Sequence, residues 1–370
     1  MIGMQVSKQL PYLDLSEDNY LVEYGKALLD PLPSNAILVT TYDIQWTVTR
    51  YLQECESYRT DISLLSAPMM SYPWFEHHQK AYENVTFPGT HLRQDRKEDS
   101  DTFMTLSEFV TANLENGAAV FIGGNVKHLA DWRYNSDAFE HIPYGLSYRP
   151  IPDGTNKLMS ELLQNASTYY KDMLESWHRV SEALPQLAPP KKFNEETWEW
   201  MTTRDYWIKL GKASIQMAYL ATSVAPTREN TLSLARCARL GEIVLANENL
   251  NELSTSGLAH QILKNTGLCY VRLVKEKNEL PEGFDLFAPL DDISKTHVHV
   301  HNHFDEDVGD EKSGLFVRAR KLFEKETSWG AKASTRVLTL WGKFLSLPEA
   351  KSDASFATVQ ATVKALGGTA

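Results

Sequence analysis

Cysteine is scarce in this sequence, which has only Cys55, Cys237 and Cys269 among its 370 residues. Small secreted domains that depend on disulfides carry more cysteines, at shorter spacings. None of these three lies near another along the chain, and each falls within an apolar pattern of helical spacing. We therefore predict three buried, reduced thiols.

Long apolar runs are also missing, since no stretch approaches the roughly 18 residues that a membrane-spanning helix needs. The N-terminal segment MIGMQVSKQLPYLDLSEDNY lacks the basic patch and apolar run of a signal peptide. It also lacks the Arg- and Ser-rich, acid-poor character of a transit peptide. We expect no direct membrane insertion and a cytoplasmic location, including a cytoskeletal or ciliary one. If Met1 is not the native start, the lumen of the endoplasmic reticulum is the alternative.

Basic residues are fewer than acidic ones: the sequence has 37 Lys and Arg residues and 48 Asp and Glu residues, which gives a formal net charge of −11. A chain of this sign is repelled by the phosphates of nucleic acids and by anionic lipid surfaces. We therefore expect no nucleic-acid partner.

Templates of common catalytic sites are absent too. The sequence contains no GxSxG, HExxH, GxxxxGK[ST], CxxC or DxDxDG motif. We therefore predict no catalytic residues, no cofactor and no enzyme activity for this chain.

The residues that are present suit a large globular protein, with 42% hydrophobic and 11% aromatic side chains. A chain of this length favours two domains. We predict a small three-layer α/β domain over residues 1–150 and an all-helical domain over residues 151–370.

Three short apolar runs in the first half predict strands that are buried on both faces: Ala36–Thr41, Asp61–Ser66 and Ala118–Gly124. Helical patterns lie before and between them, beginning with Asn19–Asp30, which Pro31 ends. Strands and helices that alternate at this spacing imply parallel pairing with right-handed crossovers. The first half is therefore predicted to be Rossmann-like.

Two further helices of this half are predicted from apolar residues that recur on one face. The first follows Asp43, an N-cap candidate, and the second ends before Gly117. The apolar faces comprise Ile44, Val48, Tyr51, Leu52 and Cys55 in the first helix, and Leu106, Phe109, Val110 and Leu114 in the second.

Parallel sheets bind ligands at the carboxyl ends of their strands. Here those ends carry Asp43 after the first strand and Gly123-Gly124 after the third, without a GxGxxG fingerprint. Asp43 also suits a helix cap, and a glycine pair also suits a plain turn. These three residues are our candidates for a small-ligand site, with structural roles as the alternative.

The first half also carries an ordered series of residues that resembles the soluble domain of the transmembrane protein 260 family. The series is DIQWTVTRYLQECESYRTDI at 43–62, MMSYPWF at 69–75, Phe87-Pro88-Gly89, and LWGKFL at 340–345. The firm matches lie between about 36 and 90, and Thr60 departs from the family's usual proline. The resemblance marks six residues as family-motif positions: Asp43, Arg50, Tyr51, Glu56, Arg59 and Asp61.

Full-length members of that family are protein O-mannosyltransferases of the endoplasmic reticulum. The resemblance implies a soluble tail with helical repeats that faces the lumen, whereas catalysis and the lipid-linked donor belong to a multi-pass membrane body. These residues match only the tail, so catalysis by this chain alone is not expected.

Beyond residue 156, strand patterns give way to helical ones. Predicted helices are Leu158–Leu174, Arg204–Ser223, Asn230–Leu245, Ser256–Val274, Glu311–Lys325, Ala331–Leu347 and Asp353–Leu366. Helix pairs of this length favour a tetratricopeptide-like array, in which Ala235, Ala238 and Gly241 pack closely. An irregular bundle is the alternative. Asp353 is predicted to be an N-cap and Gly367 the residue after the last helix. Trp198, Trp200 and Trp207 are expected to pack between the two halves.

Four histidines alternate in the run KTHVHVHNHFDEDVGD, namely His297, His299, His301 and His303. On a strand they would share one face, about 7 Å apart, and imidazoles bind zinc, copper or nickel. Structural metal sites usually draw ligands from separate elements. We predict a solvated loop at 277–310 and no metal site, with these histidines as the alternative ligands.

Our first functional hypothesis is a non-catalytic scaffold subunit that contacts other proteins of a larger assembly through helical repeats. The alternative is the luminal portion, or a companion subunit, of a protein O-mannosyltransferase. A third hypothesis is a small-molecule sensor that uses Asp43 and Gly123.

Overall fold

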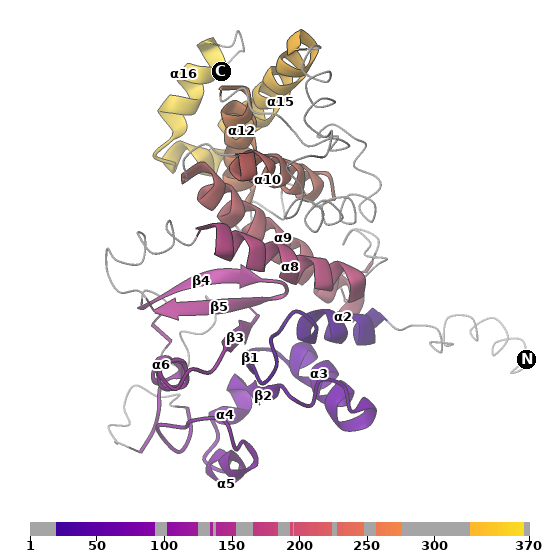
Figure 1. Cartoon of the computed structure of the whole chain (residues 1–370), viewed down its shortest axis with the longest axis vertical. Helices are drawn as coiled ribbons and strands as arrows, with labels where there is room; N and C mark the ends of the chain where they lie inside the picture. The colour runs from indigo at the N-terminus through magenta and orange to yellow at the C-terminus, as the bar shows by residue number, and fades with distance from the viewer. Residues whose placement is uncertain are drawn as a thin grey trace, which may run out of the picture.

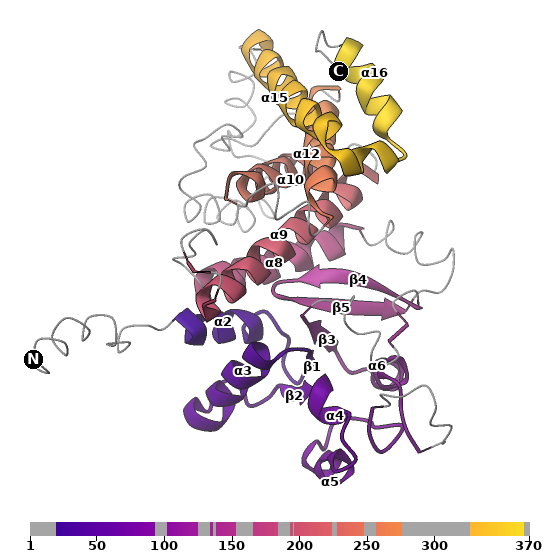
Figure 2. The same ribbon diagram turned by 180° about the vertical axis from the view of Figure 1, so that it is seen from behind.

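The computed structural model describes residues 20–92, 102–124, 134–135, 138–152, 166–183, 193–194, 196–223, 228–247, 257–275 and 326–365. Figures 1 and 2 show the strands and the early helices toward one end of the molecule and the later helices, up to α16, toward the other. The predicted mixture of an α/β first half and a helical second half is confirmed at this level.

A sheet of five strands organises the first half, in the order β2-β1-β3-β5-β4. Its strands are β1 (Ile37–Thr40), β2 (Ser63–Ser66), β3 (Val120–Gly123), β4 (Phe139–Tyr144) and β5 (Ser147–Pro152). The strands β2, β1 and β3 pair in parallel, as predicted. Their side chains are almost all buried, because helices cover both faces of the sheet.

Sequence patterns did not predict the antiparallel hairpin of β4 and β5, because prolines interrupt both strands. Pro143 lies in β4, an edge strand, where a missing N–H is tolerated. In β5, only Ser147 and Tyr148 pair with β3, so Pro150 lies where β4 is its sole neighbouring strand. The hairpin could have been predicted from the two short runs of strand-forming residues that flank Gly145, which has a φ of 52°.

The first helices occupy the predicted places: α2 spans Tyr20–Leu29, α3 spans Asp43–Glu56 and α6 spans Leu106–Glu115. A capping box of Thr105 and Glu108 begins α6, and Gly117, with a φ of 79°, follows its end as predicted.

Two predictions about α3 are wrong. Asp43 is the first helical residue rather than the N-cap, which is Tyr42. The buried face is also rotated from the apolar one, because Tyr51 and Cys55 are exposed whereas polar side chains are buried. The buried residues are Ile44, Gln45, Thr49, Leu52 and Gln53. Each of the three polar side chains makes at least one hydrogen bond there: the Gln45 amide donates to the Tyr24 hydroxyl, the Thr49 hydroxyl to the Gln45 carbonyl and the Gln53 amide to the Ile62 carbonyl.

A short irregular segment follows β2, made of α4 (Ala67–Met70), α5 (Phe75–His78) and the 3₁₀ turn η1 (Gln79–Ala81). The Ser66 hydroxyl at the end of β2 caps α4 by accepting from the Met69 N–H.

The second half contains helices that overlap the predicted ranges, but the first runs to Ala183 rather than Leu174 and the second begins at Trp198 rather than Arg204. They are α8 (Ala166–Ala183), α9 (Trp198–Ser223), α10 (Arg228–Asn247), α12 (Ala259–Lys275), α15 (Glu326–Ser346), the 3₁₀ turn η5 (Pro348–Ser352) and α16 (Phe356–Ala365). Asp353 is not the N-cap of α16, which starts three residues later; it accepts from the Ser355 N–H and pairs with Lys264 instead. The predicted helix at 311–325, the loop at 277–310 and Gly367 lie outside the described residues.

Small residues let the later helices approach closely. A Cβ atom on Gly241 of α10 would collide with Thr266 of α12, and one on Gly267 of α12 would collide with Trp341 of α15. Ala235 and Ala238 are fully buried on α10. The stack from α9 through α10, α12 and α15 therefore depends on residues that leave room for a neighbouring helix.

Two apolar cores flank the sheet, because successive strand residues point to opposite faces. Ile37 and Val39 belong to the core beneath α4 and α6. Leu38, between them, belongs to a larger core that continues through the later helices as far as Val363. Burial is thus continuous across residue 150. Trp207 is fully buried in this larger core, but Trp198 is 55% exposed, so its predicted packing role is wrong.

Candidate functional site: the family-motif residues and the carboxyl edge of the sheet

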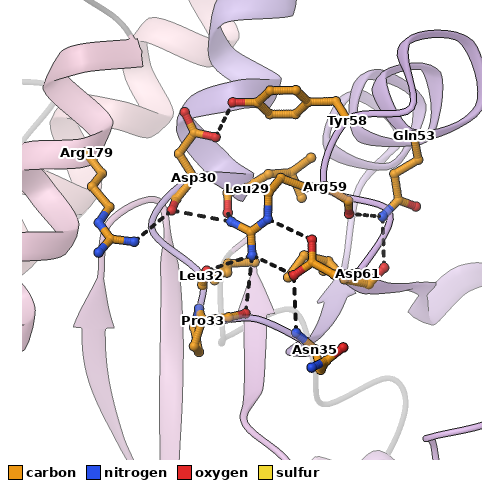
Figure 3. Close-up of polar contacts among 11 residues, drawn as sticks. Leu29, Asp30, Leu32, Pro33, Asn35, Gln53, Tyr58, Arg59, Asp61 and Arg179 are labelled. Atoms are coloured by element: carbon orange, nitrogen blue, oxygen red, sulfur yellow. Dashed lines mark hydrogen bonds and ion pairs between the residues drawn. The ribbon is translucent and has the colours of Figure 1, made fainter.

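The strongest polar constellation among the family-motif positions is centred on Arg59, in the loop between α3 and β2 (Figure 3). Its Nη1 donates to the Leu29 carbonyl at 2.8 Å, and its Nη2 donates to the Leu32 carbonyl at 2.9 Å. Its Nε and Nη2 also donate to the Asp61 carboxylate at 2.9 and 3.0 Å. We call this arrangement the Arg59 clip. It satisfies the carbonyl of Leu29, the last residue of α2, which the helix itself leaves unpaired, and a second carbonyl in the turn that follows.

Neighbouring side chains extend the Arg59 clip on both sides. The Tyr58 hydroxyl donates to Asp30 at 2.5 Å, and burial followed by this bond raises the pKa of Tyr58 to about 12. Gln53 donates from α3 to the carbonyls of Arg59 and Ile62 at 2.9 and 2.8 Å. The clip thereby joins the end of α2, the body of α3 and the start of β2.

Backbone geometry at the Arg59 clip is unusual. Arg59 has a φ of 48°, and Ser57, which ends α3, has a φ of 53°. Residues other than glycine seldom adopt this left-handed region. The hydrogen bonds described above, together with the bond from the Tyr58 N–H to the Leu52 carbonyl, hold the loop in this conformation.

Asp61 is held as an anion by the same contacts. It accepts from Arg59 and from the Asn35 N–H at 3.2 Å. The hydrogen bond from Arg59 is the largest cause that lowers the pKa of Asp61 below its ordinary value.

The other four motif residues do not join the clip. Arg50 pairs with Glu54 at 2.6 Å on the surface of α3 and lies over the Trp46 ring at 5.8 Å. Asp43, Tyr51 and Glu56 are exposed on the same helix. The structure therefore brings together Arg59 and Asp61 but separates them from the remaining motif positions.

A second polar constellation lies at the carboxyl edge of the sheet, beside α9. The hydroxyls of Tyr24 and Tyr42 lie 2.7 Å apart, and both donate to the Asp205 carboxylate, at 2.9 and 3.0 Å. Gln45 donates to the Tyr24 hydroxyl at 3.3 Å. We call these four residues the Asp205 network. Burial, followed by the charge of Asp205, raises the pKa of both tyrosines well above the usual value.

Lys209 extends the Asp205 network along α9. Its ammonium donates to the Leu146 carbonyl, lies 3.9 Å from Asp205, and lies 5.2 Å from the centre of the Tyr148 ring. Lys209 is only 2% exposed, and this burial lowers its pKa. The Asp205 network therefore joins the β4–β5 hairpin, α2 and α3 to the helical half.

Gly123 and Gly124 end β3 next to this network. A Cβ on Gly123 would collide with the Gln45 amide, and one on Gly124 would collide with the Thr41 hydroxyl, which donates to the Gly123 carbonyl at 3.1 Å. The backbone of Gly124 is also left-handed, with a φ of 81°. Both glycines are required here because side chains after β1 fill the space between β1 and β3. Gln45 Oε1, in the same place, is buried without a hydrogen-bond partner.

Sequence reasoning identified the strand ends but missed Tyr24, Tyr42, Asp205 and Lys209. These residues carry no shared motif, and Asp205 lies far along the chain from the two tyrosines. The one available signal was the opposite charge of Asp205 and Lys209, which lie four residues apart in a predicted helix.

An aromatic cluster is exposed after β2, where the family resemblance continues. The rings of Tyr72 and Trp74 stack with centres 5.7 Å apart, and His78 meets Trp74 edge-on at 5.2 Å. Tyr72 and Trp74 are 51% and 43% exposed, and Met69 beside them is 37% exposed. We call these four residues the aromatic patch. Exposed aromatic clusters of this kind are typical of contact surfaces.

A partly buried histidine lies on the β4–β5 hairpin. His141 Nε2 is 2.6 Å from the Tyr134 hydroxyl. Burial, followed by the charge of Lys212, lowers the pKa of His141 to about 4. This histidine is therefore neutral at physiological pH.

Within the described ranges, no group of three or more His, Cys, Asp or Glu side chains is placed to hold a metal ion. His297, His299, His301 and His303 lie outside those ranges. No helix in the described part of the chain combines the length and the apolar character that a bilayer crossing demands.

Curated proteins that are similar to this chain include two protein O-mannosyl-transferases. Protein O-mannosyl-transferase tmem260 of Dictyostelium discoideum is 26% identical over 215 residues, which cover 58% of this chain and 24% of that protein. Protein O-mannosyl-transferase TMEM260 of Mus musculus is 23% identical over 326 residues, which cover 81% of this chain and 43% of that protein. The chain thus spans less than half the length of either relative.

These similarities confirm the resemblance drawn from the motif residues, and they relate the chain to glycosyltransferases. No model of a protein family matches the sequence, and no solved structure does.

Proposed function

We propose that this chain is a non-catalytic, protein-contacting component of a protein O-mannosyl-transferase system. The observation that carries the proposal is similarity to two such enzymes across as much as 81% of this chain but less than half of either relative. The chain would act either as a portion of such an enzyme or as its companion subunit.

The use of charged groups supports a non-catalytic role. Glycosyl transfer needs a carboxylate that is available to the reacting sugar or acceptor. Asp61 is engaged by Arg59, and Asp205 is engaged by two tyrosine hydroxyls. Both carboxylates therefore stabilise the fold.

The aromatic patch and the helical stack are the proposed contact surfaces. We infer that the helices form a tetratricopeptide-like array, in which neighbouring helix pairs leave a concave face for a partner. The aromatic patch adds apolar contact area with little conformational entropy to lose, because Tyr and Trp have few rotatable bonds. We expect other proteins of the assembly as the partners.

We favour the lumen of the endoplasmic reticulum over the cytoplasm, because the resemblance implies that such tails face that lumen. A glycan on Asn84 or Asn165, both of which begin an Asn-X-Ser/Thr sequon, would support this location.

The experiment is purification of the tagged full chain from its native cells, with quantification of co-purifying proteins. We expect fixed partners at stoichiometric levels. The double variant Tyr72→Ser, Trp74→Ser is expected to lose partners, and Tyr51→Ser, which removes an aromatic ring that is 48% exposed elsewhere, is expected to retain them. A monomer without partners would contradict the contact role. Mannose transfer by the purified chain alone would contradict the non-catalytic role.

A second candidate function is a small-ligand sensor at the carboxyl edge of the sheet. The unpartnered Gln45 Oε1 favours it, since a buried acceptor is costly unless a donor reaches it. Asp43, Gly123 and Gly124 remain the proposed ligand residues. Thermal-shift measurements with nucleotides and sugar nucleotides test this function, and the absence of any shift would contradict it.

A further inference from the structure

Two cysteines that are far apart in the sequence meet in the core of the helical half. Cys237 lies on α10 and Cys269 lies on α12, and both side chains are buried and not in a disulfide. The two side chains interact, since Cys237 is the largest cause that raises the pKa of Cys269. This contact is invisible in the sequence, where about 30 residues separate the two positions.

The helix packing next to the thiols explains why they can meet. Gly241 lies one turn after Cys237 in α10, and Thr266 lies one turn before Cys269 in α12. A side chain on Gly241 would collide with Thr266, so the two backbones approach each other unusually closely at this level. Because the pairing runs in opposite directions along the two helices, α10 and α12 are antiparallel at this contact.

Close approach is the geometric requirement of a disulfide. The Cα atoms of bonded cysteines lie about 4.4–6.8 Å apart, whereas helix axes usually lie about 8–10 Å apart. A glycine at the crossing shortens the separation between the helices. The third cysteine, Cys55, is exposed on α3, outside this helix pair.

We propose that Cys237 and Cys269 form an intrachain disulfide that links α10 to α12 when the chain folds in the presence of a disulfide oxidant. The pair rests on the burial of both thiols and on the packing of α10 against α12, and it does not depend on the proposed transferase role. Whether the bond is present then depends on the compartment in which the helical half folds, because such bonds form and persist in oxidising compartments and are rare in the reducing cytosol.

The chemistry is two successive thiol–disulfide exchanges. The thiolate of one cysteine attacks the oxidant's disulfide, which forms a mixed disulfide and releases one thiolate. The second cysteine then attacks the protein sulfur of that mixed disulfide, forms the Sγ–Sγ bond and releases the second thiolate. The two cysteine protons pass to the two released thiolates, so the protein loses two electrons and the oxidant gains them.

Burial determines when this exchange occurs. The hydrogen bond from Cys237, followed by burial, raises the pKa of Cys269 well above its usual value, so the thiolate is rare in the folded state. The oxidant also has no route to fully buried sulfurs. We therefore expect the bond to form during folding, before α10 and α12 close over it.

The test is to unfold and reduce the full-length chain and refold it with a mixture of oxidised and reduced glutathione. Free thiols are then alkylated under denaturing conditions and mapped by mass spectrometry. We expect a mass loss of about 2 Da, a cross-linked peptide pair that contains Cys237 and Cys269, and alkylated Cys55. The Cys55→Ala variant should form the same cross-link, and Cys237→Ala should leave Cys269 alkylated.

Thermal melting checks that the bond belongs to the folded chain. Oxidised wild type is expected to melt about 5 °C above reduced wild type, whereas Cys237→Ala should melt at the same temperature in both buffers. Alkylation of all three thiols, or a cross-link that includes Cys55, would overturn the proposal. A cross-link that lowers the melting temperature would overturn it too, because the bond would then distort the helix pair.

Discussion

Removal of the Arg59 side chain tests how much the Arg59 clip stabilises the fold. Arg59→Ala deletes two short bonds to the carbonyls of Leu29 and Leu32 and both bonds to Asp61. The guanidinium is only 21% exposed, so water replaces these donors incompletely. Hydrogen bonds to charged groups contribute about 1.5–3 kcal/mol each, and the partly exposed ion pair adds at most about 1 kcal/mol. With partial rehydration, we expect a loss of about 2–4 kcal/mol in the free energy of unfolding.

Arg50→Ala is the matched control, because it removes an arginine from the same motif. Arg50 pairs with Glu54 on an exposed helix surface, where such pairs contribute about 0.3–0.5 kcal/mol. Urea unfolding followed by far-UV circular dichroism measures both variants. Arg59→Lys should fall between wild type and Arg59→Ala, since an ammonium cannot reproduce the planar set of donors.

The dependence on pH gives a second measurement of the same contact. Asp61 has a lowered pKa in the folded state, so its stabilising contribution is complete above the unfolded value of about 3.8. That contribution is lost as the pH falls through the folded pKa. The stability gap between wild type and Arg59→Ala should therefore narrow below pH 3.8. Equal losses for Arg59→Ala and Arg50→Ala at neutral pH would refute our account of the clip.

Three further predictions concern the helical half and the hairpin. Asp205→Ala should cost about 3–5 kcal/mol in unfolding free energy, measured by urea denaturation, because it leaves the buried Lys209 without a counter-ion. Gly241→Ala should lower the free energy of unfolding by about 1–3 kcal/mol, because the added methyl group collides with Thr266. Gly342→Ala is the matched control: nothing lies close to this helical position, so it should raise the free energy of unfolding by about 0.5–1 kcal/mol. Thermal melting compares the two variants. The pKa of His141 is about 4 in the folded state, below its ordinary value of 6.5. Its contribution to stability is therefore complete above pH 6.5 and falls as the pH drops toward 4. His141→Gln should make the free energy of unfolding depend less on pH between 6.5 and 4.

Much of the front half could be predicted because its signals are local. The runs around Ile37, Ser63 and Val120 are short and apolar, and they became the parallel strands. The hairpin was missed because Pro143 and Pro150 argue against strands wherever the neighbours are unknown. In the folded sheet, each of these prolines has a neighbouring strand on one side only, so no strand on the other side requires a backbone N–H from it.

The buried face of α3 shows how a correct helix prediction can still give a wrong face. Apolar periodicity favoured Tyr51 and Cys55, but Gln45 and Gln53 are buried instead. Their amides bond to Tyr24 and to the loop that carries Arg59, and those partners come from other elements. The spacing of apolar residues predicts which face is buried only from hydrophobicity. It cannot predict the burial of a polar side chain whose hydrogen-bond partner lies in another element.

The sequence by itself determined the three parallel strands, most of the long helices and the relationship to mannosyl-transferases, because helix and strand periods are read from neighbouring residues and motif order survives at low identity. Only the tertiary structure decided that Arg59 clips α2 and that Asp205 meets Tyr24 and Tyr42. It alone also placed Cys237 against Cys269. Each of these contacts joins segments far apart along the chain, and their distance in space depends on how every intervening element packs.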